Sequence, residues 1–316
     1  MRTRHRNRLA TIVVFALIIA LVAAILIGLI SKLFKAEEPE PDPHAGQVYL
    51  YDGFDWVWMT PLEGVPVNEL TEEKFSAASG QIEFIGEGYD VLRGIDVSEH
   101  QKYIDWNAVA RSGVDFAFIR IGWRGYTEGG LYQDEYFESN IKGAIDAGLD
   151  VGVYMFSQAI TVQEAIEEAE FVLKRVAPYR LTLPIVFDWE KVESAGARTA
   201  DLSMSTRTDC AVAFCETVKN AGHIPCVYFN RNIGYYGFDL TRLTDYEFWF
   251  SLPEQGFPNF YYACDIWQYS FTETVPGVDG PTDMNLRFIP KPVPTPLPEE
   301  VEVEEKDRKG LKLFFK

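Results

Sequence analysis

The hydrophobic positions of this chain follow two patterns, one near the N-terminus and one from residue 93 onward. From Leu9 to Ile30, a run of 22 residues contains no charge, Asn, Gln or Pro. As a helix this run would be roughly 33 Å long, which matches a hydrocarbon core of about 30 Å. The sequence therefore predicts a transmembrane helix at residues 9–30, preceded by a basic segment at residues 1–8.

From Arg93, short apolar runs of strand length alternate with amphipathic stretches of helical period. The predicted helices cover residues 105–111, 134–147, 161–176 and 204–221. The predicted strands are RGIDVS, DFAFIRIGW, LDVGVYMFS, LPIVFDWE, IPCVYFN, YEFWFSLP, CDIWQYS and DMNLRF. Strands that are apolar on both faces and alternate with helices indicate an α/β fold with a parallel sheet, and about eight of them indicate a barrel. Few helices are expected in its last third.

Three further segments surround this predicted barrel domain at residues 93–289. Residues 31–44 are acidic and rich in Pro, which is typical of an extended linker. Residues 45–92 contain short β-like runs and form either a small β subdomain or an arm packed on the main domain. Residues 290–316 combine alternating prolines with a charged end, which predicts a spacer and a disordered terminus.

The basic residues before the apolar run predict its orientation. Arg2, Arg4, Arg6 and Arg8 favour a cytoplasmic N-terminus and an external body. A cleaved signal peptide is the alternative, but its apolar region is typically about 7 to 15 residues long and ends at a small-residue cleavage site. We therefore expect a single-pass cell-membrane protein. Its cysteines form either two disulfides or four buried thiols, and their spacing favours thiols: Cys210, Cys215, Cys226 and Cys264.

The charge distribution excludes one class of partner. The net charge is -18, and residues 1–35 carry six basic residues and no acid, so the remainder has 23 basic against 47 acidic residues, or -24. Such an acidic body would repel a phosphate backbone, so no nucleic-acid partner is expected. The sequence also indicates no obligate protein partner.

The candidate chemistry lies at the ends of the predicted strands, where a β/α barrel has its active site. Asp96, Asp188 and Glu190 close apolar runs, and the final DMN sequence offers Asp283. Asp188 and Glu190 are two apart on one strand, so they share a face, and mutual repulsion should raise the pKa of at least one. Such a pair suits glycosidic bond cleavage. The alternative is that they form ion pairs or bind a cation.

Five phrases in a fixed order then carry a family resemblance. They are GIDVSEHQ at 94–101, FAFIRIGW at 116–123, GVYMFS at 152–157, LPIVFDWE at 183–190, and DIWQYS with VPGVDGPTDMN within 265–285. Together they resemble glycoside hydrolase family 25, the Chalaropsis-type lysozymes. The resemblance implies a flattened, irregular, TIM-like β/α barrel. It also implies a muramidase that cleaves the β-1,4 bond between N-acetylmuramic acid and N-acetylglucosamine in peptidoglycan, without metal or cofactor.

The resemblance also implies a role for each matching residue. Glu190 would be the general acid, and Asp188 would hold the 2-acetamido group of the substrate for internal attack or would position water. Asp96 and Asp283 would tune this central pair. His100 and Gln101 would shape the first loop. Four residues would bind substrate: Tyr154, Tyr228, Trp267 and Gln268.

Two other function classes compete with this interpretation. One is a membrane-tethered module that binds peptidoglycan without cutting it, although the complete carboxylate set favours catalysis. The other is a different glycosidase, or a deacetylase, on a similar barrel. A deacetylase needs a metal-binding cluster, and of the four histidines His5 and His44 lie outside the predicted barrel.

Overall fold

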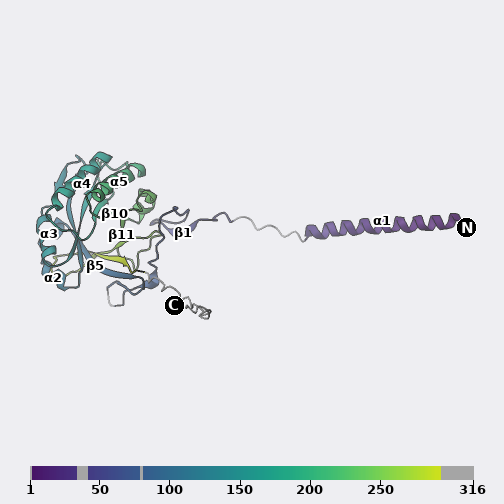
Figure 1. The fold of residues 1–316 in the computed structure, drawn as a ribbon, viewed down its shortest axis with the longest axis horizontal. Helices are drawn as coiled ribbons and strands as arrows, with labels where there is room; N and C mark the ends of the chain where they lie inside the picture. Colours follow the sequence, from purple (N-terminus) through teal and green to yellow (C-terminus); the bar gives the residue numbers. More distant parts are fainter. Residues whose placement is uncertain (1, 34–41, 79–80, 293–316) are drawn as a thin grey trace, which may run out of the picture. The chain divides into compact units, whose positions relative to one another are not determined.

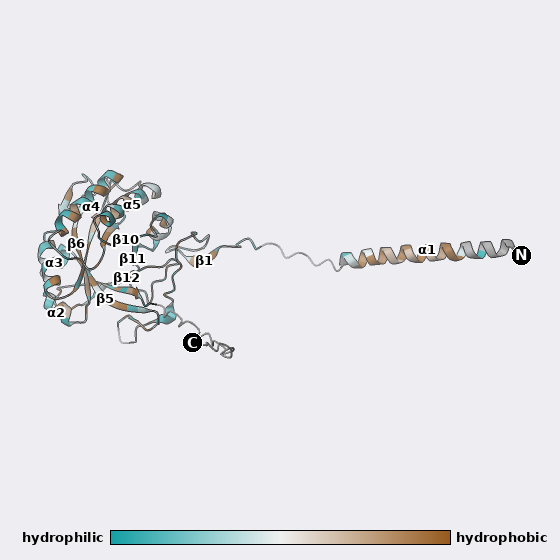
Figure 2. Cartoon of the chain, in the orientation of Figure 1, coloured by the Kyte–Doolittle hydropathy of each residue, from teal (hydrophilic) through white to brown (hydrophobic). Residues whose placement is uncertain are grey.

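A computed structural model describes residues 2–33, 42–78 and 81–292, and the chain divides into two compact units between Val48 and Tyr49. The first unit contains α1 (Arg2–Leu33). Its stretch Thr11–Lys32 has a mean hydropathy of 3.3 and no buried residue, and by length and composition it is the one helix within the described ranges that could cross a membrane (Figure 2). Of the predicted linker and tail, residues 34–41 and 293–316 lie outside the described residues.

Eight strands of the second unit close into a barrel, as the sequence predicts (Figure 1). Their spatial order is β5-β13-β12-β11-β10-β9-β8-β6, and a parallel pairing of β5 with β6 closes the ring. A ninth strand, β7 (Leu131–Gln133), pairs with the end of β6. The barrel strands are β5 (Tyr89–Val97), β6 (Phe116–Arg124), β8 (Asp150–Ser157), β9 (Ile185–Trp189), β10 (Pro225–Asn230), β11 (Glu247–Ser251), β12 (Ile266–Glu273) and β13 (Thr282–Pro290).

The sheet is not wholly parallel, which corrects the expectation from the strand pattern. β13 runs antiparallel to both β12 and β5. The physical reason is the short connection between β12 and β13, residues 274–281, which contains no helix. A parallel neighbour requires a crossover of a dozen or more residues, so a short connection returns the chain antiparallel.

Four α-helices cover the outside of the barrel between β5 and β10, and side-chain caps fix where three of them begin. Asp105, Thr161 and Ser203 accept hydrogen bonds from the first-turn amides of α2, α4 and α5. Only short helical turns follow β10, so the ring of helices is incomplete, as predicted. The helices are α2 (Trp106–Arg111), α3 (Phe137–Asp146), α4 (Val162–Val176) and α5 (Met204–Asn220), with short turns η1 (Glu72–Lys74), η2 (Glu99–Gln101), η3 (Ile233–Gly237) and η4 (Leu240–Arg242).

Alternation along the strands separates an outer and an inner core. Outward residues such as Ile119 and Phe187 pack under the helices. Inward residues such as Phe116 and Phe118 fill the barrel itself. Gly94 and Gly152 make room for these two rings, because a Cβ at either position would collide with the neighbouring phenylalanine. The lower interior is therefore closed by apolar packing, and only the carboxyl ends of the strands leave room for polar side chains.

Residues 49–78 and 81–88 lie against the barrel as an arm. The segment that holds β1 (Val48–Tyr51), β2 (Trp56–Met59), β3 (Phe75–Ser76) and β4 (Glu83–Phe84) is largely irregular. Asn68 donates from Nδ2 to the carbonyls of Pro258 and Phe260 at 2.8 and 3.0 Å. Phe75 packs edge-on against Trp267, with ring centroids 5.4 Å apart. Of the two arrangements left open by the sequence, these contacts match the packed arm.

The four cysteines are free and buried, which confirms the prediction of thiols. Burial raises the pKa of each thiol, so all four are neutral side chains in the apolar interior.

Candidate active site

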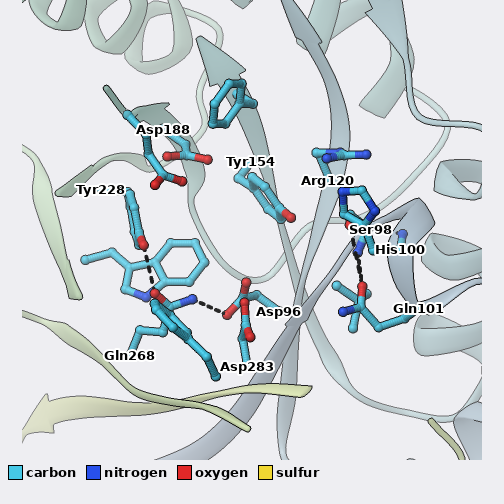
Figure 3. A pocket seen from close by; sticks show the side chains of 15 residues that line it. Asp96, Ser98, His100, Gln101, Arg120, Tyr154, Asp188, Tyr228, Gln268 and Asp283 are labelled. Atoms are coloured by element: carbon cyan, nitrogen blue, oxygen red, sulfur yellow. Dashed lines mark hydrogen bonds between the residues drawn. The ribbon is translucent and has the colours of Figure 1, made fainter. Parts of the chain in front are cut away.

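A cavity of about 330 Å³ opens at the carboxyl ends of the barrel strands (Figure 3). Asp96 and Asp188 each stand one residue before the end of their strand, so both side chains reach its floor. The 15 lining residues are Asp96, Val97, Ser98, His100, Gln101, Arg120, Tyr154, Phe156, Asp188, Glu190, Tyr228, Trp249, Gln268, Phe271 and Asp283.

Asp188 and Glu190 come from the end of β9 and share one face of it, with Trp189 on the other. Asp188 is only 4% exposed, and its Oδ1 has no hydrogen-bond partner among the described residues. Burial, followed by the charges of Glu190 and Asp96, raises the pKa of Asp188 well above its ordinary value. Burial and the charge of Asp96 also raise the pKa of Glu190. The pair thus offers a ligand both a proton and an unsatisfied acceptor.

Asp96 and Asp283 form a second carboxyl pair, because the antiparallel register places them directly opposite each other on β5 and β13. Burial raises the pKa of Asp96, while hydrogen bonds from Asn285 and Gln268 oppose that rise. Burial and the charge of Asp96 raise the pKa of Asp283, which shares a hydrogen bond with it. The two carboxyl groups therefore retain a shared proton to higher pH than an exposed aspartate would.

Side-chain amides and two rings hold Asp96 in place. Gln268 Nε2 and Asn285 Nδ2 each donate to Asp96 Oδ2 at 2.8 Å. The amide oxygens are occupied as well: Tyr228 Oη donates to Gln268 Oε1, and Trp249 Nε1 donates to Asn285 Oδ1, both at 2.8 Å. Because every amide group has a partner, the orientation of this carboxylate is fixed before any ligand arrives.

Arg120 supplies a positive charge at the cavity wall. Its Nε donates to Asp134 Oδ2 at 2.8 Å, and its Nη2 lies 3.1 Å from Glu99 Oε1. The same Asp134 oxygen accepts the backbone N–H of Glu99, which ties the loop after β5 to the barrel. The charge of Arg120 favours the ionised form of Asp188 and so partly opposes the rise in its pKa.

The loop after β5 is closed by a capping box. Gln101 Oε1 accepts the backbone N–H of Ser98 at 2.9 Å, and Ser98 Oγ accepts that of His100 at 3.3 Å. His100 and Gln101 therefore both lie in the loop that borders the cavity, where the sequence interpretation placed them (Figure 3).

Gln158 supports the chain at Glu190 from behind. This fully buried side chain donates from Nε2 to the carbonyl of Glu190 at 3.0 Å and to that of Ser157 at 2.9 Å. Its Oε1 accepts a hydrogen bond from Thr199 Oγ1 at 2.7 Å. The amide thus links the ends of β8 and β9 and the loop that follows β9.

The structure brings seven of the eight predicted site residues into the cavity: Asp96, Tyr154, Asp188, Glu190, Tyr228, Gln268 and Asp283. Trp267 is the exception. It is fully buried in the outer core, where its Nε1 donates to the carbonyl of Leu252 at 3.1 Å. Its neighbour Gln268 points inward, so alternation along β12 sends the indole to the opposite face.

Eight lining residues were not among the eight predicted site residues, although His100 and Gln101 were expected to shape the first loop: Val97, Ser98, His100, Gln101, Arg120, Phe156, Trp249 and Phe271. A signal existed for Arg120, because it is the one charge in the run FAFIRIGW and has the same parity as the inward Phe116 and Phe118. Across residues 2–33, 42–78 and 81–292, no group of three or more His, Cys, Asp or Glu side chains is arranged to hold a metal ion.

Comparison with known proteins adds sequence evidence to this geometry. The family model described as glycosyl hydrolases family 25 matches residues 95–278, more than half of the chain. "Autolytic lysozyme" of Clostridium acetobutylicum is 28% identical over 195 residues, which are 61% of this chain and 55% of that protein. "Lysozyme M1" of Streptomyces globisporus is 27% identical over 203 residues, which are 61% of this chain and 67% of that protein.

A solved structure shares the fold. The modular autolysin LytC from Streptococcus pneumoniae, in complex with a synthetic peptidoglycan ligand, superposes with a TM-score of 0.55 at 22% identity. The match covers 65% of this chain and 53% of that chain. This chain therefore spans only about half the length of LytC and of the clostridial relative.

Proposed function

This chain belongs to the glycosyl hydrolases family 25, and from that premise we propose that it is a peptidoglycan hydrolase of the lysozyme type. The bond cut is the β-1,4 bond between N-acetylmuramic acid and N-acetylglucosamine. The names of the two lysozyme relatives support this substrate, as does the peptidoglycan ligand held by LytC. The product then has a new reducing end at N-acetylmuramic acid.

The observation that carries the proposal is the buried Asp188 Oδ1 without a partner beside Glu190. In the reaction, Glu190 donates its proton to the glycosidic oxygen as the bond to the anomeric carbon breaks. Asp188 accepts the N–H of the 2-acetamido group, whose carbonyl oxygen attacks the anomeric carbon, or it positions the attacking water. Water finally adds to the anomeric carbon and returns a proton to Glu190.

Substrate binding would also decide which carboxyl carries the proton. An N–H donor placed on Asp188 favours its ionised form, so its pKa falls on binding. The neighbouring negative charge then favours the protonated form of Glu190. We therefore expect the proton held by this pair to move toward Glu190 when substrate binds. Glu190 is then protonated and ready to act as the acid only in the complex.

The remaining wall residues would position the sugars. Asp96 and Asp283, fixed by Gln268 and Asn285, keep negative charge close to the pair on β9. Tyr154 and Tyr228 offer aromatic surface to pyranose rings. Positioning of this kind lowers the barrier because the reacting groups are already aligned.

We further propose that α1 anchors the enzyme, with the N-terminus cytoplasmic and the domain at residues 93–289 outside. The length and hydropathy of Thr11–Lys32 support an anchor, and a signal sequence passes the same test. Detection of the intact N-terminus in purified cell membranes tests the anchor. An N-terminus that begins after residue 30 would contradict it.

The experiment that tests the function is mass spectrometry of fragments released from purified peptidoglycan. The wild-type protein should release fragments that end in reducing N-acetylmuramic acid, and Glu190→Gln should lower the rate by about 10²- to 10⁴-fold. Unchanged thermal unfolding of Glu190→Gln is the control for folding. A module that binds without cutting would release nothing in either form.

A further inference from the structure

The hairpin of β1 and β2, residues 48–59, presents an unusual outer face. Alternate positions on each strand place four aromatic side chains on one side: Tyr49, Tyr51, Trp56 and Trp58. Tyr49, Trp56 and Trp58 are 55%, 60% and 46% exposed, and Phe54 in the turn is 69% exposed. The solvent side of a two-stranded sheet is normally polar, so this aromatic hairpin needs an explanation beyond folding.

The opposite side of the hairpin faces the barrel. Leu50 points toward a depression that it lines together with Tyr235, Phe257 and Phe260 of the barrel unit. The apolar contact of the hairpin with the barrel is therefore made by this inner side. On the outer side, Tyr49, Trp56 and Trp58 stay at least 46% exposed.

The outer rings are held in a fixed arrangement. Tyr49 stacks on Trp56 at 5.4 Å between centroids and contacts Trp58 at 5.0 Å. In the turn, the backbone N–H of Phe54 donates a hydrogen bond to Asp52 Oδ1 at 2.8 Å. Tyr236 Oη donates a hydrogen bond to Asp52 Oδ2 at 2.6 Å. A surface that is ordered before binding loses little conformational entropy on binding.

The hairpin is attached to the barrel end that bears the cavity. The Arg231 guanidinium lies 5.5 Å from the centroid of Tyr51, and Arg231 directly follows β10. Tyr236, which holds Asp52, belongs to η3, the next turn along the chain. Tyr228 of the same strand lines the cavity. These contacts connect the aromatic face to the carboxyl end of β10. Arg231 lies three residues beyond Tyr228, which lines the cavity.

Charge limits what can occupy this face. Residues 45–92 contain nine acidic residues and one Lys, and Asp52 and Asp55 stand in the hairpin turn. This excess of negative charge repels nucleic acid and anionic lipid headgroups. Exposed indole and phenol rings with carboxylates between them match instead the uncharged sugar rings of a glycan strand, which present flat apolar C–H faces and hydroxyl groups.

We propose that the aromatic hairpin is an accessory binding surface for a glycan strand, outside the catalytic cavity. This inference rests on the proposed function, because the polymer bound is the polymer cut. It also lies outside residues 95–278, the part of the chain that the family model matches. Rings on the hairpin hold a distant part of the strand, so polymeric substrate binds more tightly than short fragments do.

The test compares full-length Tyr49→Ala/Trp56→Ala with the wild type, both in detergent micelles. In a Glu190→Gln background, the double variant should bind insoluble peptidoglycan about tenfold more weakly. In the active background, KM on polymer should rise by a similar factor, whereas kcat/KM on a short soluble fragment should stay unchanged. Tyr103→Ala, at an 81% exposed tyrosine away from the hairpin and cavity, is the matched control.

Two results would overturn the proposal. One is equal binding of polymer by the double variant and the wild type, whether or not the protein cuts it. The other is quenching of Trp56 emission by brominated phosphatidylglycerol in nanodiscs, which would place the hairpin in the lipid interface. Failure of the catalytic proposal looks different: the wild type would release no reducing ends, while binding to the polymer would still report on the hairpin.

Discussion

The cavity holds two carboxyl pairs that are equally buried and differently satisfied. Asp96 is 6% exposed and Asp188 is 4% exposed, so access to water does not distinguish them. Asp96 Oδ2 accepts two amide hydrogen bonds of 2.8 Å, and Asp283 adds a third contact. Asp188 Oδ1 has no partner in the part of the chain that the structure describes. The pair on β5 and β13 is completed by the protein, whereas the pair on β9 is not.

This difference indicates which pair meets the reacting bond. A buried acceptor without a donor costs about 1–3 kcal/mol of folding free energy, and such costs are commonly found at functional sites. The donor that would remove the cost is then expected from the substrate. Substitutions in the two pairs should therefore change stability in opposite directions, while both lower activity.

After Glu190→Gln, Asp188→Asn has the largest expected effect. It replaces the carboxylate that accepts the acetamido N–H with a neutral amide, whose oxygen is a weaker acceptor, so kcat should fall by about 10²- to 10³-fold. It also removes a carboxyl group that ionises more readily in the unfolded chain than in the buried site, so the Tm at pH 7 should rise by about 2–4 °C. Reducing-end assays and calorimetry on the same preparations measure both changes.

The pH dependence gives the sign of the stability effect. The folded pKa of Asp188 is raised above the unfolded value of about 3.9, so its favourable contribution is complete at lower pH and is lost as the pH rises through the raised value. The gain in Tm from Asp188→Asn should therefore be small at pH 4 and should widen toward pH 8. Asp201→Asn, at an exposed carboxyl, is the control. A constant gain would contradict burial and like-charge repulsion of the Asp188 carboxyl as the cause of the gain.

Asn285→Ala tests the satisfied pair and should have an intermediate effect. It leaves Asp96 with one amide donor and Trp249 Nε1 without its acceptor, so the Tm should fall by about 2–4 °C. Because the Asn285 hydrogen bond lowers the pKa of Asp96, its loss should move the acidic limb of the pH–rate profile to higher pH. We expect kcat/KM to fall about tenfold. An unchanged Tm would contradict the claim that hydrogen bonds from the protein stabilise the pair of Asp96 and Asp283.

Much of the barrel and cavity was predictable because both depend on local patterns. Strands and helices follow from the period of the apolar positions, and the two-residue spacing of Asp188 and Glu190 is sufficient to put them on one face. The same parity rule separates Gln268, which points inward, from Trp267, which the sequence interpretation assigned to the substrate. An aromatic residue at a strand end therefore indicates a site only when its parity matches that of the polar residues beside it.

Other features depend on contacts that no local pattern contains. The contact of Asp96 with Asp283 requires the antiparallel register of β5 with β13, strands nearly 200 residues apart. The support of Glu190 by Gln158 joins two loops 32 residues apart. The inward position of Arg120 was missed because its neighbours in the sequence are apolar. Its partners Asp134 and Glu99 come from separate loops.

Gln158→Ala has the smallest expected effect on activity. It tests whether the Gln158 amide is needed to hold Glu190 in position. The substitution removes a donor from the Glu190 carbonyl without touching either carboxyl group. A less well positioned acid should lower kcat about three- to tenfold while KM stays unchanged, because substrate contacts remain. Thr199→Val, which removes only the hydroxyl that orients the Gln158 amide, should lower kcat less. If KM rises instead and kcat holds, Gln158 shapes the cavity wall and does not position Glu190.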